Sequence, residues 1–418
     1  MRQNETIRPD PFHLEPDMAD LSSSVVGAGT PRRRILVIAS LTSSLVNFRF
    51  DLLTELSRRA EVLACAPDDD PATQGKLQEI GVGFRRIPMA RAGLNPFQDL
   101  RTLLALVRIC RDFRPDVLFP YTMKPIIYGC LAGRLTGVEN RLPLCTGLGY
   151  VFSASTPDAR QRAVRLISVL LYRAALKGAK EAIVYNAGDE ATFRRHRLVG
   201  PGVPVSRVPG SGVNIARFPE VPPPSGPPVF LMVGRLLRMK GVPEYVAAAR
   251  KLKRLHPGVR CQLLGPFDEN PTSVVQDDLD AWIREGSIEY LGHTADVRPY
   301  LVASSVFVLP SHGEGIARSV LEAMSTGRAV VTTDAPGCPE PIIPGKTGFV
   351  VPVGDVDALT AAMARFVDEP SLIPMMGKAA RRHVEDTFEV GKVNRLLVTK
   401  MGLADAVTRV APSAGSIG

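Results

Sequence analysis

The sequence predicts an α/β protein with two doubly wound domains, each a mostly parallel sheet covered by helices on both faces. Short apolar runs alternate with longer stretches of helical periodicity along most of the chain, which is typical of parallel sheets. A proline-rich stretch, 219–228, interrupts this alternation, which then begins again. The length of 418 residues is also more than a single hydrophobic core usually supports. We therefore expect a linker at 219–228 between two separate domains.

The first domain is expected at residues 34–218. It opens with an apolar run, 34–40, that predicts a strand buried on both faces. Further strands are expected at 61–66, 83–87, 117–121, 142–146 and 181–185, and helices at 48–60, 95–113, 125–136 and 158–179. Residues 1–33 are polar and contain no apolar signal core, so we expect a disordered extension there.

The second domain is expected at residues 229–385. Its strands are predicted at 229–233, 262–264, 288–291, 306–309, 329–332 and 349–351, with helices in most of the gaps. A terminal helical segment is expected at 386–402, and 403–418 is expected to be a loose tail. Doubly wound domains bind ligands at the carboxyl ends of their strands, so we expect ligands in a cleft between the domains.

The composition indicates a soluble globular protein, with 45% hydrophobic and 22% charged residues. No run of eighteen apolar residues is present, so no membrane-spanning helix is predicted. The six cysteines form no C-x-x-C pair, which favours free thiols in a reducing cytoplasm and no zinc site. The acidic run 68–70 precedes a predicted helix and is interpreted as a capping loop, so we expect no metal.

The net charge of +9 is distributed unevenly along the chain. Residues 31–218 carry 28 basic and 15 acidic side chains, whereas residues 219–418 carry 21 and 22. The excess positive charge therefore belongs to the first domain. Such asymmetry predicts a polyanionic or membrane-surface partner for that domain.

The stretch 311–324 is the centre of the predicted site. It follows the apolar run 306–310 and continues with apolar residues at helical spacing, so it predicts a strand, a loop and a helix. Glu314 and Glu322 are eight residues apart, or ~12 Å along a helix, and both carboxylates can face one long ligand. An ordinary turn with two solvated glutamates is the alternative.

This stretch resembles the glutamate–seven residues–glutamate motif of the family-4 glycosyltransferases. The resemblance continues through 334–340 and 346–351 and covers the chain from about residue 34 to 397. It implies a retaining, metal-independent enzyme of the GT-B fold, in which two Rossmann-like domains face each other across a cleft. It also implies a nucleotide-sugar donor, here expected to be UDP-linked, and a terminal helix that braces the first domain.

The loop 234–241 resembles the family's donor-diphosphate loop, and Arg235 and Lys240 are its cations. A departing nucleoside diphosphate gains negative charge, which fixed cations stabilise. The resemblance implies that Glu314 and the backbone N–H groups of Gly315 to Ala317 face the donor sugar, and that Glu322 contacts the ribose. We treat Glu314, Arg235 and Lys240 as catalytic candidates. The full set of predicted donor contacts is Gly234, Arg235, Lys240, Gly265, His293, Glu314, Gly315, Ile316, Ala317 and Glu322.

The first domain is expected to bind the acceptor. Segments 91–96, 121–129 and 145–149 resemble bacterial enzymes that extend polyprenyl-diphosphate-linked sugars for capsule, O-antigen or glycan assembly. The predicted acceptor contacts are Asn47, Arg91 and Lys124. The two cations among them are expected to face the acceptor's diphosphate. His312 is interpreted as a residue that shapes its loop.

The predicted helix 158–179 carries a basic face. Arg162, Arg165, Arg173, Lys177 and Lys180 fall within a ~120° arc at 100° per residue. Such a face beside apolar residues suits an anionic bilayer, although a solvated face is an equal alternative. We therefore expect a peripheral enzyme on the cytoplasmic side of a membrane.

Two other functions remain as alternatives. A nucleotide-sugar 2-epimerase of the same fold would not need a first domain this basic. A nucleic-acid-binding protein would fit the pI of about 9.4, but the charge avoids the second domain and no nucleic-acid motif is present. We expect no nucleic-acid partner.

Overall fold

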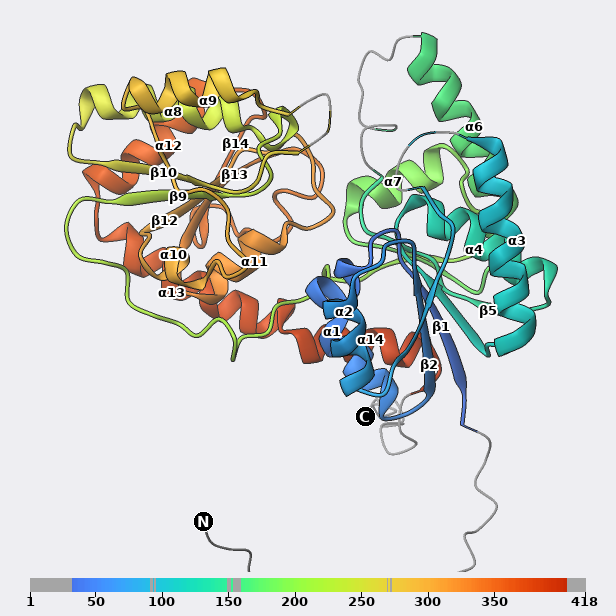
Figure 1. Cartoon of the computed structure of the whole chain (residues 1–418). Helices are drawn as coiled ribbons and strands as arrows, with labels where there is room; N and C mark the ends of the chain where they lie inside the picture. The colour runs from blue at the N-terminus through green and yellow to red at the C-terminus, as the bar shows by residue number, and fades with distance from the viewer. Residues whose placement is uncertain are drawn as a thin grey trace, which may run out of the picture. The chain divides into compact units, whose positions relative to one another are not determined.

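A computed structural model describes residues 32–403, except 91, 92, 94, 149–151, 153–158, 269, 271 and 272. The predicted N-terminal extension up to residue 31 and the tail from residue 404 lie outside the described residues. Between them the chain forms two α/β domains with parallel sheets, as predicted (Figure 1).

The first domain contains a five-stranded sheet in the order β3-β2-β1-β4-β5 and a three-stranded sheet in the order β6-β7-β8. All of their paired strands are parallel. A parallel bridge between Tyr121 and Leu144 connects the end of β4 to β6 and continues the first sheet into the second. The strands are β1 (Arg34–Ile38), β2 (Glu61–Ala66), β3 (Gly83–Arg86), β4 (Val117–Pro120), β5 (Asn140–Arg141), β6 (Leu144–Cys145), β7 (Ala182–Val184) and β8 (Val205–Arg207).

Helices cover both faces of this domain, and each face has its own buried core (Figure 1). On one face lie α3 (Pro96–Phe113), α4 (Met123–Leu135), α6 (Ala159–Leu176) and α7 (Ala187–Arg195). On the other lie α1 (Ser43–Ser57), α2 (Pro71–Glu79) and α14 (Val390–Lys400). The last of these is the predicted terminal helix, and its Val393 and Leu397 are fully buried in the first domain's core.

Helix α1 begins five residues earlier than predicted. The sequence at 42–44 is polar and therefore suggested a loop. In the structure the Thr42 amide donates to the Asp68 carboxylate (2.8 Å), and the Thr42 hydroxyl donates to the Asp68 carbonyl (2.9 Å). These bonds satisfy polar groups at the start of the helix, so the chain enters it directly after β1.

The second domain is a six-stranded parallel sheet in the order β11-β10-β9-β12-β13-β14. Its strands are β9 (Val229–Val233), β10 (Arg260–Leu264), β11 (Glu289–Tyr290), β12 (Val306–Leu309), β13 (Ala329–Thr333) and β14 (Gly348–Val351). Its helices are α8 (Val242–Leu255), α9 (Gln276–Arg284), α10 (Arg298–Val302), α11 (Arg318–Ser325), α12 (Val356–Asp368) and α13 (Leu372–His383), with a 3-10 turn at Arg238–Lys240 and a π-helix at Val384–Phe388. The order 3-2-1-4-5-6 is that of a doubly wound nucleotide-binding domain.

The second domain's core begins before the predicted linker. Val213 and Phe218, predicted to belong to the first domain, are buried in the second core. Val213 pairs with the chain on either side of Glu389, because its amide donates to Phe388 and its carbonyl accepts from Val390. Arg328 is fully buried and donates to the carbonyls of Val221 and Leu301, which fixes the proline-rich segment to this domain.

No helix among the described residues is long and apolar enough to cross a membrane. All six cysteines are buried and free, and burial raises the pKa of Cys65 to about 12. A buried thiol of this kind is unreactive.

Candidate functional site

The site lies at the point where the second sheet changes winding direction. Strands β9 and β12 are neighbours in that sheet. From β9 the chain continues to β10 on one side, and from β12 it continues to β13 on the other side, so the loops after these two strands lead away from each other. The loop after β9 contains residues 234–241, and the loop after β12 contains residues 310–317. In doubly wound folds, ligands bind where two such loops separate.

Two glycines allow the loops of this edge to touch. A Cβ atom at Gly241 would lie 2.0 Å from the Pro310 carbonyl oxygen, and the φ of Gly241 is 78°. A Cβ atom at Gly265, directly after β10, would lie 1.8 Å from the Gly234 carbonyl oxygen. Since any side chain would separate these backbones, the close approach of the three loops depends on glycine.

Lys240 and Glu314 form an ion pair across the β9 and β12 loops. The Lys240 ammonium lies 2.6 and 2.7 Å from the two carboxylate oxygens of Glu314. The Glu314 side chain is 9% exposed and that of Lys240 24%. The structure therefore brings together two of the predicted catalytic residues, and their charges compensate each other.

Arg235 has a carboxylate partner as well. Its guanidinium donates to Asp268 (2.6 Å), which follows β10, while about half of the arginine side chain remains exposed. Asp268 was not among the residues predicted from the sequence. An arginine that donates to a carboxylate can also donate to phosphate oxygens, and its planar guanidinium can contact two of them at once.

The amide groups that precede α11 are available to a ligand. The Glu314 amide donates to the Pro336 carbonyl (2.9 Å), but within the described part of the chain the amides of Gly315, Ile316 and Ala317 have no hydrogen-bond acceptor. Helix α11 starts at Arg318, so these amides lie at its positive end. Free amides at a helix N-terminus form an anion-binding site.

Glu322 lies on α11, four residues after the helix starts at Arg318. Its carboxylate accepts from Arg318 (2.9 Å). Burial raises the pKa of Glu322, and Arg318 opposes this shift. Arg318 also donates to the backbone carbonyl of Asn47 and lies 5.6 Å from the ring centroid of Phe48. Asn47, predicted to bind the acceptor, thus meets the second domain through its backbone.

His312 anchors the β12 loop to α8. Its Nε2 atom lies 2.8 Å from the Glu244 carboxylate, and its amide donates to the Met239 carbonyl (3.0 Å). The hydrogen bond to Glu244 raises the pKa of His312. Burial alone would raise the pKa of Glu244, but the bond from His312 reverses the shift and lowers it. The two directions agree, so His312 and Glu244 form an ion pair.

His293 is exposed at the edge of the site. It follows Gly292, whose carbonyl accepts from the Gly265 amide (2.8 Å). The predicted donor residues Gly234, Gly265 and His293 therefore lie on the neighbouring loops after β9, β10 and β11.

The acceptor residues predicted in the first domain are less accessible than expected. The Lys124 ammonium lies 2.9 Å from the Asp99 carboxylate, and both side chains are nearly buried between α3 and α4. Burial and the Asp99 carboxylate together raise the pKa of Tyr128, which hydrogen-bonds to the same acid. Lys124 is thus paired with Asp99 in the structure, and its predicted contact with the acceptor's diphosphate stays a prediction. Arg91 lies outside the described residues.

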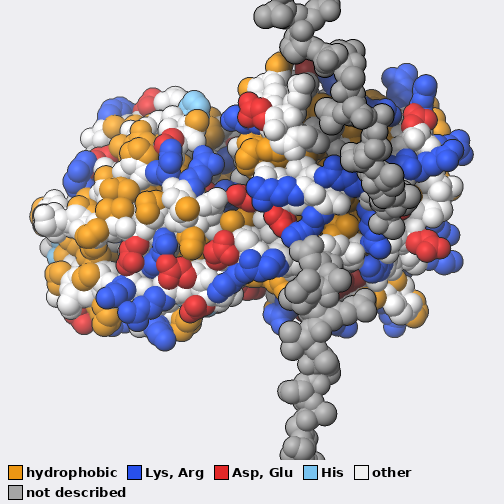
Figure 2. Space-filling model, turned by 90° about the horizontal axis from the view of Figure 1, so that it is seen from below, with side chains coloured by type: hydrophobic (Ala, Val, Ile, Leu, Met, Phe, Trp, Pro, Cys, Tyr) orange, Lys and Arg blue, Asp and Glu red, His pale blue; other side chains and the backbone are white. Residues whose placement is uncertain are grey.

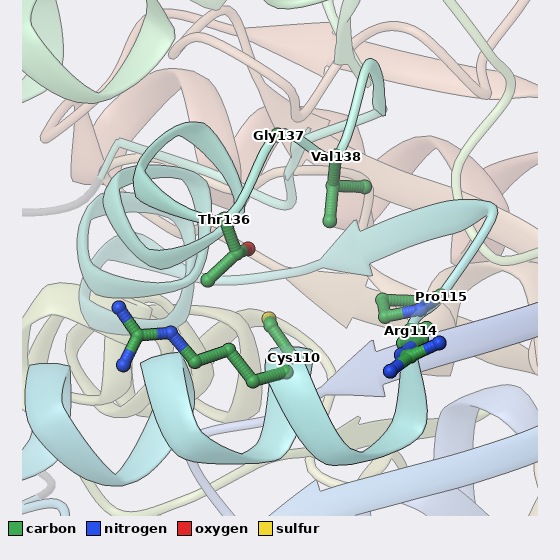
Figure 3. A pocket seen from close by; sticks show the side chains of 7 residues that line it. Cys110, Arg114, Pro115, Thr136, Gly137 and Val138 are labelled. Carbon is green, nitrogen blue, oxygen red and sulfur yellow. The ribbon is translucent and has the colours of Figure 1, made fainter.

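A depression of about 480 Å³ lies at the other end of the first sheet (Figure 3). Its lining includes Cys110, Arg114 and Thr136, which precede β4 and β5. It therefore lies at the amino ends of those strands, away from the edge where doubly wound folds bind ligands.

No group of three or more His, Cys, Asp or Glu side chains in the described ranges is arranged to hold a metal ion. The acidic run 68–70 has structural roles, because Asp68 binds Thr42 and Asp70 accepts from the Thr73 amide (3.0 Å) to cap α2. The capping interpretation of this run is confirmed.

Two doubly wound domains with parallel sheets define the GT-B fold. Solved structures support that fold. The chain superimposes on sucrose-phosphate synthase from Thermosynechococcus elongatus with a TM-score of 0.71 and 19% identity, covering 88% of this chain and 98% of the other. It superimposes equally well on the Anabaena protein HepE in complex with UDP (TM-score 0.71, 16% identity, 89% and 100% covered).

Family models and sequence relatives identify the protein further. Residues 215–383 match "Glycosyl transferases group 1", and residues 48–210 match "Glycosyl transferase 4-like domain". A Campylobacter jejuni N,N'-diacetylbacillosaminyl-diphospho-undecaprenol alpha-1,3-N-acetylgalactosaminyltransferase is 28% identical over 361 residues, covering 83% of this chain and 93% of the relative. An Escherichia coli UDP-Gal:alpha-D-GlcNAc-diphosphoundecaprenol alpha-1,3-galactosyltransferase is 25% identical over 320 residues (73% and 80%). The chain belongs to the glycosyltransferases, which confirms the family predicted from the sequence.

Proposed function

We propose that this enzyme transfers a hexose or N-acetylhexosamine from a UDP-linked donor to a polyprenyl-diphosphate-linked saccharide. The product would serve cell-surface polysaccharide or glycan biosynthesis. The observation that carries the proposal is the convergence of Lys240, Arg235 and three free amides at the switch point of the second sheet. The C. jejuni and E. coli relatives, whose names specify undecaprenyl-diphosphate acceptors, support the acceptor class.

The site supplies what departure of a nucleoside diphosphate requires. The bond between the sugar's anomeric carbon and the diphosphate oxygen breaks, and a bond from the acceptor hydroxyl to that carbon forms. Negative charge then grows on the diphosphate, where Arg235, Lys240 and the amides of Gly315 to Ala317 stabilise it. The released diphosphate accepts the hydroxyl proton, so attack and departure on one face of the sugar retain its configuration without a protein nucleophile.

The ion pairs of the site suggest how it changes when the donor binds. The diphosphate would replace Asp268 and Glu314 as the partners of Arg235 and Lys240, since phosphate oxygens carry more charge than one carboxylate. Glu314 would then be free to accept hydrogen bonds from sugar hydroxyls, as an ionised carboxylate can. The cations perform the charge neutralisation for which other enzymes use a divalent metal, so we propose a metal-independent reaction.

We further propose that the first domain binds the cytoplasmic face of an anionic membrane. Leu166, Ile167 and Leu170 on α6 are large apolar side chains exposed by 44–61%. Arg162 beside them is exposed, and residues 159–180 contain no acid. Arg173, by contrast, donates to the carbonyls of His196 and Arg197, so this part of the basic arc is bonded to the protein itself.

Helix α3 contributes a second apolar stripe. Phe97, Leu100 and Leu104 are exposed by 52–82% and are spaced at three and four residues, so they share one face of α3. Both α3 and α6 pack against α4. Lys and Arg side chains are also spread over the first domain on the face shown in Figure 2. Apolar side chains among cations suit the boundary between acyl chains and anionic headgroups.

A transfer assay with defined products tests the proposed function. The enzyme is incubated with a panel of nucleotide sugars and a polyprenyl-diphosphate-linked N-acetylhexosamine. The products are then separated, and their masses are measured by mass spectrometry. We expect a lipid-linked saccharide one sugar longer, with release of the nucleoside diphosphate. Interconversion of the donor without transfer would instead support the epimerase, and tight binding of nucleic acid without either reaction would support the binding protein.

A further inference from the structure

Arg49 is a buried cation without an anionic partner. It lies on α1 and is 3% exposed. Among the described residues no carboxylate forms an ion pair with it. Its guanidinium donates to the Tyr185 hydroxyl, and its Nε atom is buried without a hydrogen-bond partner. An unpaired buried charge lowers the stability of the fold unless an anion or further hydrogen bonds compensate it.

The other two buried arginines show how this chain satisfies a structural guanidinium. Arg328 directs its hydrogen bonds to backbone carbonyls, among them those of Leu301 and Val221. Arg141 donates to the carbonyls of Val138, Lys177 and Gly178. Arg49 has no carbonyl acceptor within the described structure, so its surroundings do not fit a purely structural role.

Aromatic side chains hold Arg49 in place. Its guanidinium carbon lies 5.2 Å from the ring centroid of Tyr121 and 5.8 Å from that of Tyr185. The Tyr121 hydroxyl is 2.8 Å from the Ser44 hydroxyl, so it does not serve the guanidinium. Rings of this kind attract a cation and fix its position, but they do not neutralise its charge.

This cluster lies beneath the donor loop. Tyr121 directly follows β4 and Tyr185 directly follows β7, so both lie at the carboxyl edge of the first domain's sheets. A Cβ atom at Gly315 would be 3.2 Å from the Tyr185 ring. Gly315 carries one of the free amides of the proposed donor site, and Tyr185 contacts both Gly315 and the Arg49 guanidinium.

We propose that Arg49 is a positioning residue whose uncompensated charge attracts a diphosphate bound at the donor loop. The proposal rests on the proposed function and adds Arg49 of the first domain to the cations that attract a diphosphate. The charge acts through buried protein of low dielectric constant instead of water, so its attraction is only weakly screened. The diphosphate is that of the donor or that of the lipid-linked acceptor, and both offer the same chemistry.

The test compares Arg49→Met with three other variants of the full chain. Arg49→Lys keeps the charge, and Arg58→Met removes an exposed cation just beyond the same helix. Arg328→Met removes a buried arginine with a structural role. Thermal unfolding is measured alone and with UDP or inorganic pyrophosphate, and KM is measured for a diphosphate-linked and a diphosphate-free acceptor.

We expect Arg49→Met to unfold at the parental temperature or above, since it removes an unpaired buried charge. Its Kd for UDP or pyrophosphate should rise about 10-fold if the donor diphosphate is attracted. If the acceptor diphosphate is attracted, KM should rise by a similar factor for the diphosphate-linked acceptor alone. Arg49→Lys should restore most of the loss, Arg58→Met should bind as the parent does, and Arg328→Met should unfold at a lower temperature.

Two results would overturn the inference. One is an Arg49→Met variant that is destabilised or unfolded, as Arg328→Met is expected to be, because Arg49 would then be structural. The other is a stable variant with unchanged Kd and KM values. If UDP and pyrophosphate fail to stabilise even the parent, the proposed donor site falls together with this inference.

Discussion

Replacing Lys240 should change two quantities that can be measured separately, the free energy of unfolding and the turnover rate. Lys240→Met leaves the Glu314 carboxylate, 9% exposed, without the cation that lies 2.6–2.7 Å away. Charged hydrogen bonds of this type contribute about 1.5–3 kcal/mol, so we expect the free energy of unfolding to fall by that amount. The loss should be nearer the lower limit, because Lys240 is partly exposed.

The double variant Lys240→Met with Glu314→Gln removes both charges of the ion pair. It removes the unpaired charge, so most of the lost stability should return, because deleting both partners avoids the penalty of an unpaired buried carboxylate. Turnover should stay about 10²–10³-fold below the parent in both variants, since neither can stabilise the departing diphosphate.

Urea unfolding and initial-rate kinetics on the parent, both single variants and the double variant complete this cycle. Arg235→Ala serves as a comparison, because its partner Asp268 is on the surface of the same site and the arginine is half exposed. Arg235→Ala should lose activity to a similar degree with little change in stability. Parental turnover in Lys240→Met would refute the assignment of the β9 loop, and recovery of turnover in the double variant would show that only the unpaired Glu314 had been harmful.

Three further perturbations and one solution condition test other parts of the site. Glu244 raises the pKa of His312 above its ordinary value of 6.5, so the ion pair stabilises the fold fully below pH 6.5. The difference in free energy of unfolding between the parent and His312→Gln, measured by urea unfolding, should therefore shrink as the pH rises through the raised pKa. A difference that grew with pH would contradict the ion pair. Gly265→Ala should abolish UDP binding measured by calorimetry, since its Cβ would lie 1.8 Å from a carbonyl oxygen, and parental binding would contradict the loop contact. Turnover should be unchanged by a chelator, and loss that Mg²⁺ or Mn²⁺ restores would overturn the metal-independent reaction. Phe97→Ser should weaken sedimentation with anionic vesicles, whereas Leu255→Ser should not, although Leu255 on α8 is also a largely exposed apolar residue (69%, against 82% for Phe97). Equal effects would exclude a specific membrane face.

The sequence predicted most of the second domain because its signals are local. Strands β9 and β12 have the predicted bounds, since each is a short apolar run that ends at a glycine or proline. The loop cations and the glutamate pair could be found because they follow these strands directly. Their partners could not: Asp268 and Glu244 come from other loops and helices, and only the sheet order places them beside Arg235 and His312.

The first domain was harder to predict, because its polar residues have partners distant in sequence. Lys124 resembled a free cation, but Asp99, 25 residues earlier, neutralises it across two helices. The sequence did not predict a buried Arg49, because a single arginine in a helix pattern is usually exposed. Its burial becomes evident only when β4 and β7 bring Tyr121 and Tyr185 around it.

Hydrogen–deuterium exchange with and without UDP tests the central claim most directly, since it reports which backbone amides the donor covers. We predict slower exchange in segments 234–241 and 312–318, because the free amides before α11 and the β9 loop would bind the diphosphate. Segments around the distant depression at Cys110 and Thr136 should exchange at an unchanged rate. Protection confined to that depression, or no protection of 312–318 at saturating UDP, would contradict the account.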